Sequence, residues 1–117
     1  MSKAEIIREE IEEDGTLYSA ILIEFKNAYV VVLSEGGENL GTLAYSMPLK
    51  PKTSTVPLSS ILLGERNKTI SRLIAERLAS SVNRMVLVSV YSRNMDERKI
   101  GRIFLGLLEK ILKKKEP

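Results

Sequence analysis

Alternating and continuous runs of hydrophobic residues in the first half of the chain predict β-strands. Residues 16–26 (TLYSAILIEFK) and 28–34 (AYVVVLS) are apolar on both faces, and residues 38–47 (ENLGTLAYSM) follow a pair of glycines. Asn27 lies between the first two strands, where tight turns favour this residue type. We therefore expect these three strands to form an antiparallel meander.

Hydrophobic residues in the second half recur with helical spacing. One helix is predicted to follow Asn67 and to end near Asn83, and a strand apolar on both faces follows at residues 84–92 (RMVLVSVYS). In the last helix, Asn94 is the expected N-cap and Glu97 completes a capping box. The apolar stripe of that helix consists of Ile100, Ile103, Phe104, Leu107, Leu108, Ile111 and Leu112.

Two further segments have weaker patterns. Ser2 and Glu5 have capping-box spacing and Gly15 is a suitable helix terminator, so we predict a peripheral N-terminal helix within residues 1–14. A proline-rich stretch starts at Pro48 and extends past Pro57. It is predicted to be an edge strand or a long crossing loop, because proline is not tolerated in a central strand.

Together these elements predict a single α+β domain over residues 1–117, with a single mostly antiparallel β-sheet flanked by helices. Two amphipathic helices can cover one face of the sheet, but the strands are apolar on both. An apolar face left in water usually marks an interface, so we expect a dimer or a hetero-complex. The candidate residues for a dimer face or core face of the sheet are Tyr18, Leu22, Val86, Val88 and Val90.

Composition removes most kinds of catalytic chemistry. The chain has no cysteine and no histidine, which excludes disulfides, thiol nucleophiles, histidine metal ligands and histidine-based triads. No histidine is present to activate Ser59 or Ser60. We therefore expect no enzymatic activity and no catalytic, cofactor-binding or metal-binding residues.

Charge and hydropathy indicate where the protein works. Net charge is only +3, and Lys113, Lys114 and Lys115 lie where a helix C-terminus favours cations, so we expect no nucleic-acid partner. Apolar runs fall far short of the ~20 residues that span a bilayer, so we expect a cytoplasmic protein without a membrane partner. Glutamine is missing and charged residues make up 28% of the chain, a pattern typical of thermophiles.

The segment GERNKT (residues 64–69) has some features of a phosphate-binding loop. Such a loop needs a glycine directly before its lysine, and Asn67 stands there. Gly64 lies four residues before Lys68, whereas the motif requires six. A turn followed by a helix capped by Asn67 or Thr69 explains the segment better than nucleotide binding does.

Residues 54–92, followed by an amphipathic C-terminal helix, resemble the proteasome assembly chaperones three and four. The structural signature is Leu62, Leu63 and Gly64 at the end of an extended segment, followed by a short polar turn and a helix. Residues 17–47 resemble the opening strands of that family less specifically. The compact chain and the thermophilic composition imply an archaeal homologue.

The resemblance implies a non-enzymatic chaperone that binds 20S proteasome α subunits as a dimer and promotes α-ring assembly. Its implied partners are α subunits and either a second copy of itself, as a homodimer, or a paralogous chaperone. In this reading the exposed turn contacts the partner through Glu65, Arg66, Asn67 and Lys68. An alternative with the same element order is a roadblock-like or longin-like dimerisation module of a GTPase-regulating complex.

Overall fold

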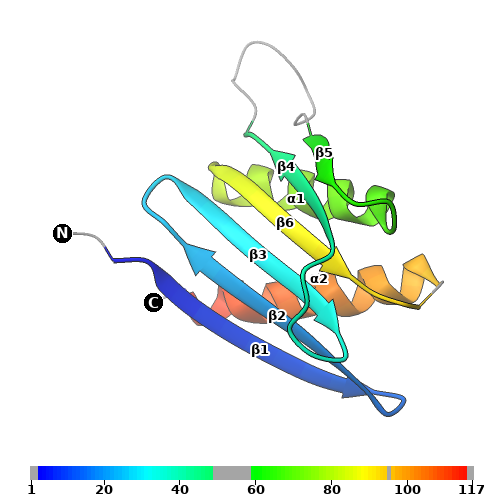
Figure 1. The fold of residues 1–117 in the computed structure, drawn as a ribbon. Coiled ribbons are helices and arrows are strands. Elements are labelled where there is room, and N and C mark those ends of the chain that lie inside the picture. Colours follow the sequence, from blue (N-terminus) through cyan, green and yellow to red (C-terminus); the bar gives the residue numbers. More distant parts are fainter. Residues whose placement is uncertain (1–2, 49–58, 95, 116–117) are drawn as a thin grey trace.

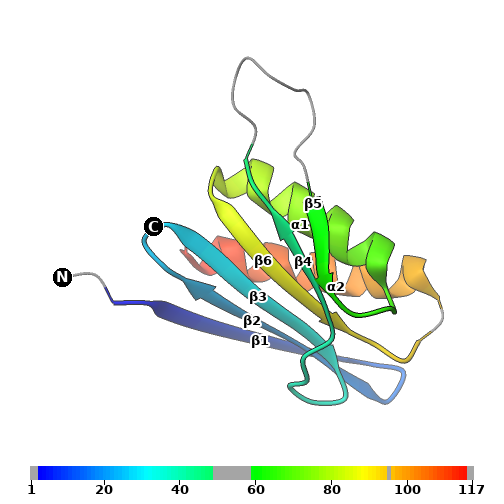
Figure 2. The same ribbon diagram turned by 45° about the horizontal axis from the view of Figure 1, so that its top comes forward.

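The computed structural model describes residues 3–48, 59–94 and 96–115. One open six-stranded sheet forms the first layer, and both helices pack on the same face of it as the second layer (Figures 1 and 2). The strands are β1 (Glu5–Glu13), β2 (Thr16–Glu24), β3 (Ala28–Glu35), β4 (Thr42–Ser46), β5 (Ser59–Leu63) and β6 (Met85–Tyr91), and the helices are α1 (Lys68–Val82) and α2 (Glu97–Lys115).

The strand order across the sheet is β1-β2-β3-β6-β4-β5. Every neighbouring pair is antiparallel except β3 and β6, which are parallel. The predicted α+β class and the mostly antiparallel sheet are therefore confirmed. β5 is an edge strand that follows the proline-rich stretch, of which residues 49–58 lie outside the described part of the chain.

The predicted three-stranded meander is wrong in its third strand. β2 and β3 form the expected hairpin, but β4 pairs with β6 and β5 and not with β3. The chain crosses the end of β6 at Gly41, where a Cβ atom would overlap the backbone carbonyl of Val90. The Gly41 amide also donates a hydrogen bond to Ser89 Oγ at 2.8 Å. β6 therefore takes the place beside β3 that local sequence patterns assigned to β4.

The predicted N-terminal helix is also wrong, because these residues form β1. β1 pairs antiparallel with β2 along its whole length, from Glu5 opposite Glu24 to Glu13 opposite Thr16. This pairing gives the backbone hydrogen-bond partners, and it turns Ile7 and Ile11 together toward the helices, where both pack against the core. Gly15 closes the hairpin with φ +77° rather than ending a helix.

Ion pairs with α2 explain why an acidic segment is stable as this edge strand. On the helix side of the sheet, Glu13 pairs with Arg102 at 3.1 Å and Glu9 pairs with Lys114. Asp14 in the hairpin turn pairs with Lys99 at 2.8 Å, and this hydrogen bond and charge hold the pKa of Asp14 below its usual range. The acids that would oppose the dipole of a helix therefore meet cations from 80 or more residues away in the chain.

The caps of the two helices differ from the sequence predictions. Asp96 caps α2, because its Oδ1 accepts hydrogen bonds from the amides of Arg98 at 3.1 Å and Lys99 at 3.3 Å. Asn94 lies outside the helix, and its Oδ1 accepts a bond from the Asp96 amide. Asn67 occupies the N-cap position of α1 with φ 57° but makes no side-chain cap. Its Nδ2 instead donates to the Ser92 carbonyl at 3.3 Å.

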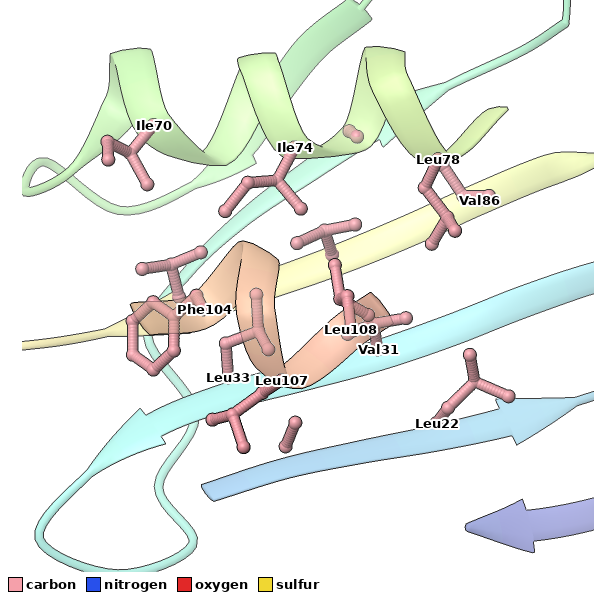
Figure 3. Packing of buried hydrophobic residues seen from close by; sticks show 14 of the residues in the cluster. Leu22, Val31, Leu33, Ile70, Ile74, Leu78, Val86, Phe104, Leu107 and Leu108 are labelled. Carbon is pink, nitrogen blue, oxygen red and sulfur yellow. The ribbon is translucent and has the colours of Figure 1, made fainter. Parts of the chain in front are cut away.

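The core lies between the sheet and the two helices. α1 packs over β4, β5 and β6, and α2 packs over β1 and β2. Tyr18 and Phe104 meet edge to face at 5.9 Å between ring centroids. Figure 3 shows Ile74, Leu78 and Leu108 projecting from the helices into this layer, together with side chains from the strands. Among the described residues, 21 buried hydrophobic side chains form this cluster.

Candidate binding surface

The face of the sheet opposite the helices is covered by no described helix and is mostly apolar, although at one end the loop at residues 36–41 lies on it and bonds to Ser19, Ser34 and Ser89. We call it the open face. Both helices contact the other side of the sheet, as the two views of the ribbon show (Figures 1 and 2). Strand register and alternation place on it the side chains Ile21, Ile23, Val30, Val32, Leu43, Tyr45 and Leu87.

These side chains are contiguous across the sheet. Ile23 is opposite Val30, Val30 is opposite Leu87, and Leu87 is opposite Tyr45. Cross-strand neighbours on one face are ~5 Å apart, so the four form an unbroken row over four strands. A second row joins Ile21 to Val32, and it is interrupted before Leu43 at Ser89, which is 1% exposed because the chain at Gly41 lies over it.

Exposure rises toward the two edges of the open face. All seven side chains are partly accessible, whereas Ile6 at the β1 edge is 56% exposed and Leu63 at the β5 edge is 65% exposed. Along β1 the face ends in charged residues, where Arg8 pairs with Glu38 at 3.1 Å. The face therefore has a charged boundary along β1, as the rim of a protein interface does, and an apolar edge at β5.

The five residues predicted for a dimer or core face all lie on the helix side of the sheet. Tyr18, Leu22, Val86, Val88 and Val90 are at most 2% exposed beneath the helices, so they form the core face. The residues of the open face alternate with them along each strand, and the sequence pattern did not single them out. Both sets are apolar, so alternation alone does not say which one the helices cover.

One sequence signal does separate the two faces in β4. Its helix side carries the small residues Thr42, Ala44 and Ser46, which are all buried, and its open side carries Leu43 and Tyr45. Small side chains let the α1 backbone pack closely on the sheet, whereas large ones on the opposite side remain free to meet a partner. In β3 and β6 both faces are apolar, so the contrast in β4 identifies the covered face only once the structure places α1 over it.

The predicted partner-binding residues comprise the loop between β5 and α1 and the first residue of α1, and we call them the tip loop (residues 65–68). Glu65, Arg66 and Lys68 are exposed, and Asn67 is partly buried. The loop is short and braced, because Glu65 pairs with Lys68 at 3.4 Å and the Arg66 carbonyl accepts a hydrogen bond from Thr42 Oγ1. Its side chains are therefore presented to solvent from a fixed backbone.

The residues of the sequence signature have distinct positions. Gly64 has φ +102° and lies so close to β4 that a Cβ atom would stand 2.7 Å from Thr42 Cα. Leu62 and Leu63 are 52% and 65% exposed beside a register shift in the β4–β5 pairing. Gly64 therefore sets the turn, and the two leucines extend the apolar surface to the edge of the sheet rather than anchoring the loop in the core.

A charged cluster closes the opposite end of the sheet. Glu24 accepts hydrogen bonds from Arg84 Nη1 at 2.7 Å, from Tyr29 at 3.2 Å and from Lys115, the last residue of α2. The bond from Lys115 is the largest influence that lowers the pKa of Glu24, and those from Arg84 and Tyr29 add to it against the opposing effect of burial. The cluster joins β2, β3, β6 and α2 through their ends.

The described residues contain no group of three or more acidic side chains arranged to hold a metal ion. No helix in that part of the chain has the length and hydropathy needed to cross a membrane.

Comparison with known proteins gives one family. The model of the family described as proteasome assembly chaperone 4 matches residues 17–91, which is more than half of the chain. A search of curated protein sequences found no match. A yeast structure described as a novel chaperone complex for 20S proteasome assembly is similar in fold, with a TM-score of 0.66 and 19% identity over 94% of this chain and 93% of that one.

The matched region contains β2, β3, β4, β5, α1 and β6, and with them all seven residues of the open face and the tip loop. β1 and α2 lie outside it, although the similarity in fold extends over nearly the whole chain. The chain therefore belongs to the proteasome assembly chaperone 4 family and has its role in proteasome assembly.

Proposed function

We propose that this protein is a non-enzymatic chaperone that dimerises through the open face, binds α subunits of the 20S proteasome and promotes assembly of the α ring. The observation that carries the proposal is the combination of family membership with an uncovered apolar sheet face. Family membership links the chain to proteasome assembly. The open face is an apolar surface whose exposure to water is unfavourable until a partner covers it.

A second copy of the chain is the proposed partner for the open face. The row from Ile23 to Tyr45 is apolar and contains no charged residue. Two copies can therefore meet there without placing like charges together. A two-fold axis through the centre of the face would bring each row against its counterpart, as isologous interfaces do. The charged β1 rims would then remain at the periphery, where they stay hydrated.

The tip loop is the proposed contact with the α subunit. It lies at the end of the sheet, beyond the apolar rows, so that dimerisation through the open face leaves it accessible (Figure 1). Its fixed backbone lowers the entropy cost of binding, because few dihedral angles need to be ordered. Reversible binding through a small polar loop suits a chaperone that leaves the assembled particle.

The test is co-purification of the purified chain with isolated α subunits, followed by native mass measurement. We expect a complex that contains two copies of the chain and at least one α subunit, and no complex with the finished 20S particle. Failure to bind any α subunit, together with binding to a small GTPase, would overturn the proposal in favour of a GTPase-regulating module.

Two exposed cations test the tip loop. Arg66→Glu should weaken α-subunit binding about tenfold while the dimer mass and melting temperature stay unchanged. The matched control is Lys26→Glu, an exposed cation in the β2–β3 turn at the other end of the sheet. Equal affinities for these two variants would show that the tip loop is not the contact.

A further inference from the structure

A groove separates the C-terminal halves of α1 and α2 on the outer surface of the helical layer. Its volume is about 190 Å³, and Ile74, Leu78 and Leu108 at its base are among the buried core residues. The remaining residues that line it are Leu105 and Leu112, which are partly exposed, and Arg77, Ser81 and Glu109, which are exposed.

The two helices approach closely near their N-terminal ends. A Cβ atom on Gly101 of α2 would stand 3.0 Å from Ile70 Cδ1 of α1, so glycine is what allows this approach. One turn further along α2, Leu105 replaces glycine and the lining of the groove begins. The groove is thus built into the packing of the helices, open to solvent and lined by leucines.

Opposite charges on the two walls have no partner among the described residues. Arg77 lies on α1 and Glu109 on α2, and neither makes an ion pair or a side-chain hydrogen bond with another residue in the described part of the chain. Most cations of α2, by contrast, are engaged, since Lys99, Arg102, Lys114 and Lys115 all pair with acids from β1, β2 or their turn. Beside its apolar base the groove therefore offers one positive and one negative group that no other described residue pairs with.

We propose that this groove binds one large apolar side chain, a leucine or an aromatic residue, from a segment of the α subunit that carries an acidic and a basic residue beside it. The acid would pair with Arg77 and the base with Glu109. A cavity of ~150 Å³ lined by aliphatic side chains accommodates a benzene ring, so the volume of this groove suits one such side chain. The identity of the partner rests on the proposed function.

The groove remains available in the proposed dimer. It lies on the helical side of the molecule, whereas the open face lies on the opposite side of the sheet (Figure 2). Two-fold pairing through the open face would direct one groove outward from each copy. The dimer would then carry a pair of identical anchoring sites in addition to the tip loops.

Charge reversal on the groove walls tests this inference. Arg77→Glu and Glu109→Arg should each weaken α-subunit binding about tenfold, as loss of a charge pair at an interface does. Lys110→Glu is the matched control, because Lys110 is exposed on the same turn of α2 but does not line the groove. It should change the affinity less than twofold. Dimer mass and melting temperature report whether each variant is folded.

If wild type binds the α subunit and the groove variants bind it equally well, the groove inference is refuted and the proposed function stands. If wild type binds no α subunit, the proposed function fails. A peptide titration then tests whether the groove binds an apolar side chain. The probe is acetyl-Glu-Phe-Lys-amide, followed by methyl NMR. We expect shifts at Leu105, Leu108 and Leu112 that disappear in Ser81→Trp, which fills the groove. Absence of those shifts would refute it.

Discussion

Two adjacent residues of β6 give the sharpest test of which sheet face is the interface. Val88 is 0% exposed beneath the helices, and Leu87 is partly exposed on the open face. The same substitution, to aspartate, places a carboxylate on opposite sides of one strand. We expect Val88→Asp to unfold the protein and Leu87→Asp to leave a folded monomer.

The expected magnitudes follow from burial. At Val88 the change loses ~2 kcal/mol of hydrophobic burial. Keeping the new carboxyl neutral near pH 7 costs a further ~4 kcal/mol, because its pKa must rise by about three units. A total of ~6 kcal/mol equals the whole stability of a domain at the lower end of the typical range of 5–15 kcal/mol. At Leu87 the carboxylate stays hydrated, so the monomer should lose only about 1–2 kcal/mol.

Leu87→Asp should instead weaken the dimer. In a two-fold interface Leu87→Asp buries two unpaired carboxylates, and one uncompensated buried charge already costs ~3–5 kcal/mol. The dissociation constant should therefore rise at least ~100-fold. Analytical ultracentrifugation measures the mass, and urea denaturation followed by circular dichroism measures stability. A Leu87→Asp variant that stays dimeric, or that unfolds as Val88→Asp does, would refute the assignment of the open face as the dimer interface.

Further predictions concern the charged cluster and two glycines. Glu24 has a folded-state pKa below its usual value, so its ionised form stabilises the fold above about pH 4.5, and this stability is lost as the pH falls through the folded-state pKa. The free energy of unfolding, measured by denaturation from pH 7 to pH 3, should therefore depend less on pH in Glu24→Gln than in wild type. An equal pH dependence in the two proteins would count against the cluster. Gly64→Ala should destabilise by ~2 kcal/mol or more, because φ is +102° and the new methyl overlaps Thr42. Gly106→Ala in α2, where a Cβ atom meets nothing within 4 Å, should stabilise by ~1 kcal/mol. Thermal melts of the two alanine variants should therefore shift in opposite directions.

The elements with one strong period were predicted well from sequence. The apolar stripe from Ile100 to Ile111 is buried in α2, and the alternating segments at β2 and β3 form the expected hairpin. The N-terminal segment was misread because Ile6, Ile7 and Ile11 fit either a narrow helix or a strand. Edge pairing with β2 decided it, since that pairing brings the acids of the hairpin to the cations of α2.

The candidate binding surface was likewise predicted only in part. Apolar composition on both faces of β3 and β6 follows from sequence and requires a partner for one of them. Which face the helices cover does not follow, because alternating residues such as Leu87 and Val88 are equally hydrophobic. The insertion of β6 between β3 and β4 was equally invisible, since it depends on contacts between residues about 45 apart.

The sequence by itself therefore determined the class of the fold, the lack of histidine and cysteine chemistry, and the presence of more apolar strand surface than two helices cover. These properties depend on residue type and on periods of two or 3.6, which are local. Only the tertiary structure decided the strand order, the conformation of the first segment and the identity of the open face. Each of those depends on long-range pairing, in which the backbone of Gly41, the cations of α2 and the small side chains of β4 determine which of two locally equivalent arrangements has the lower free energy.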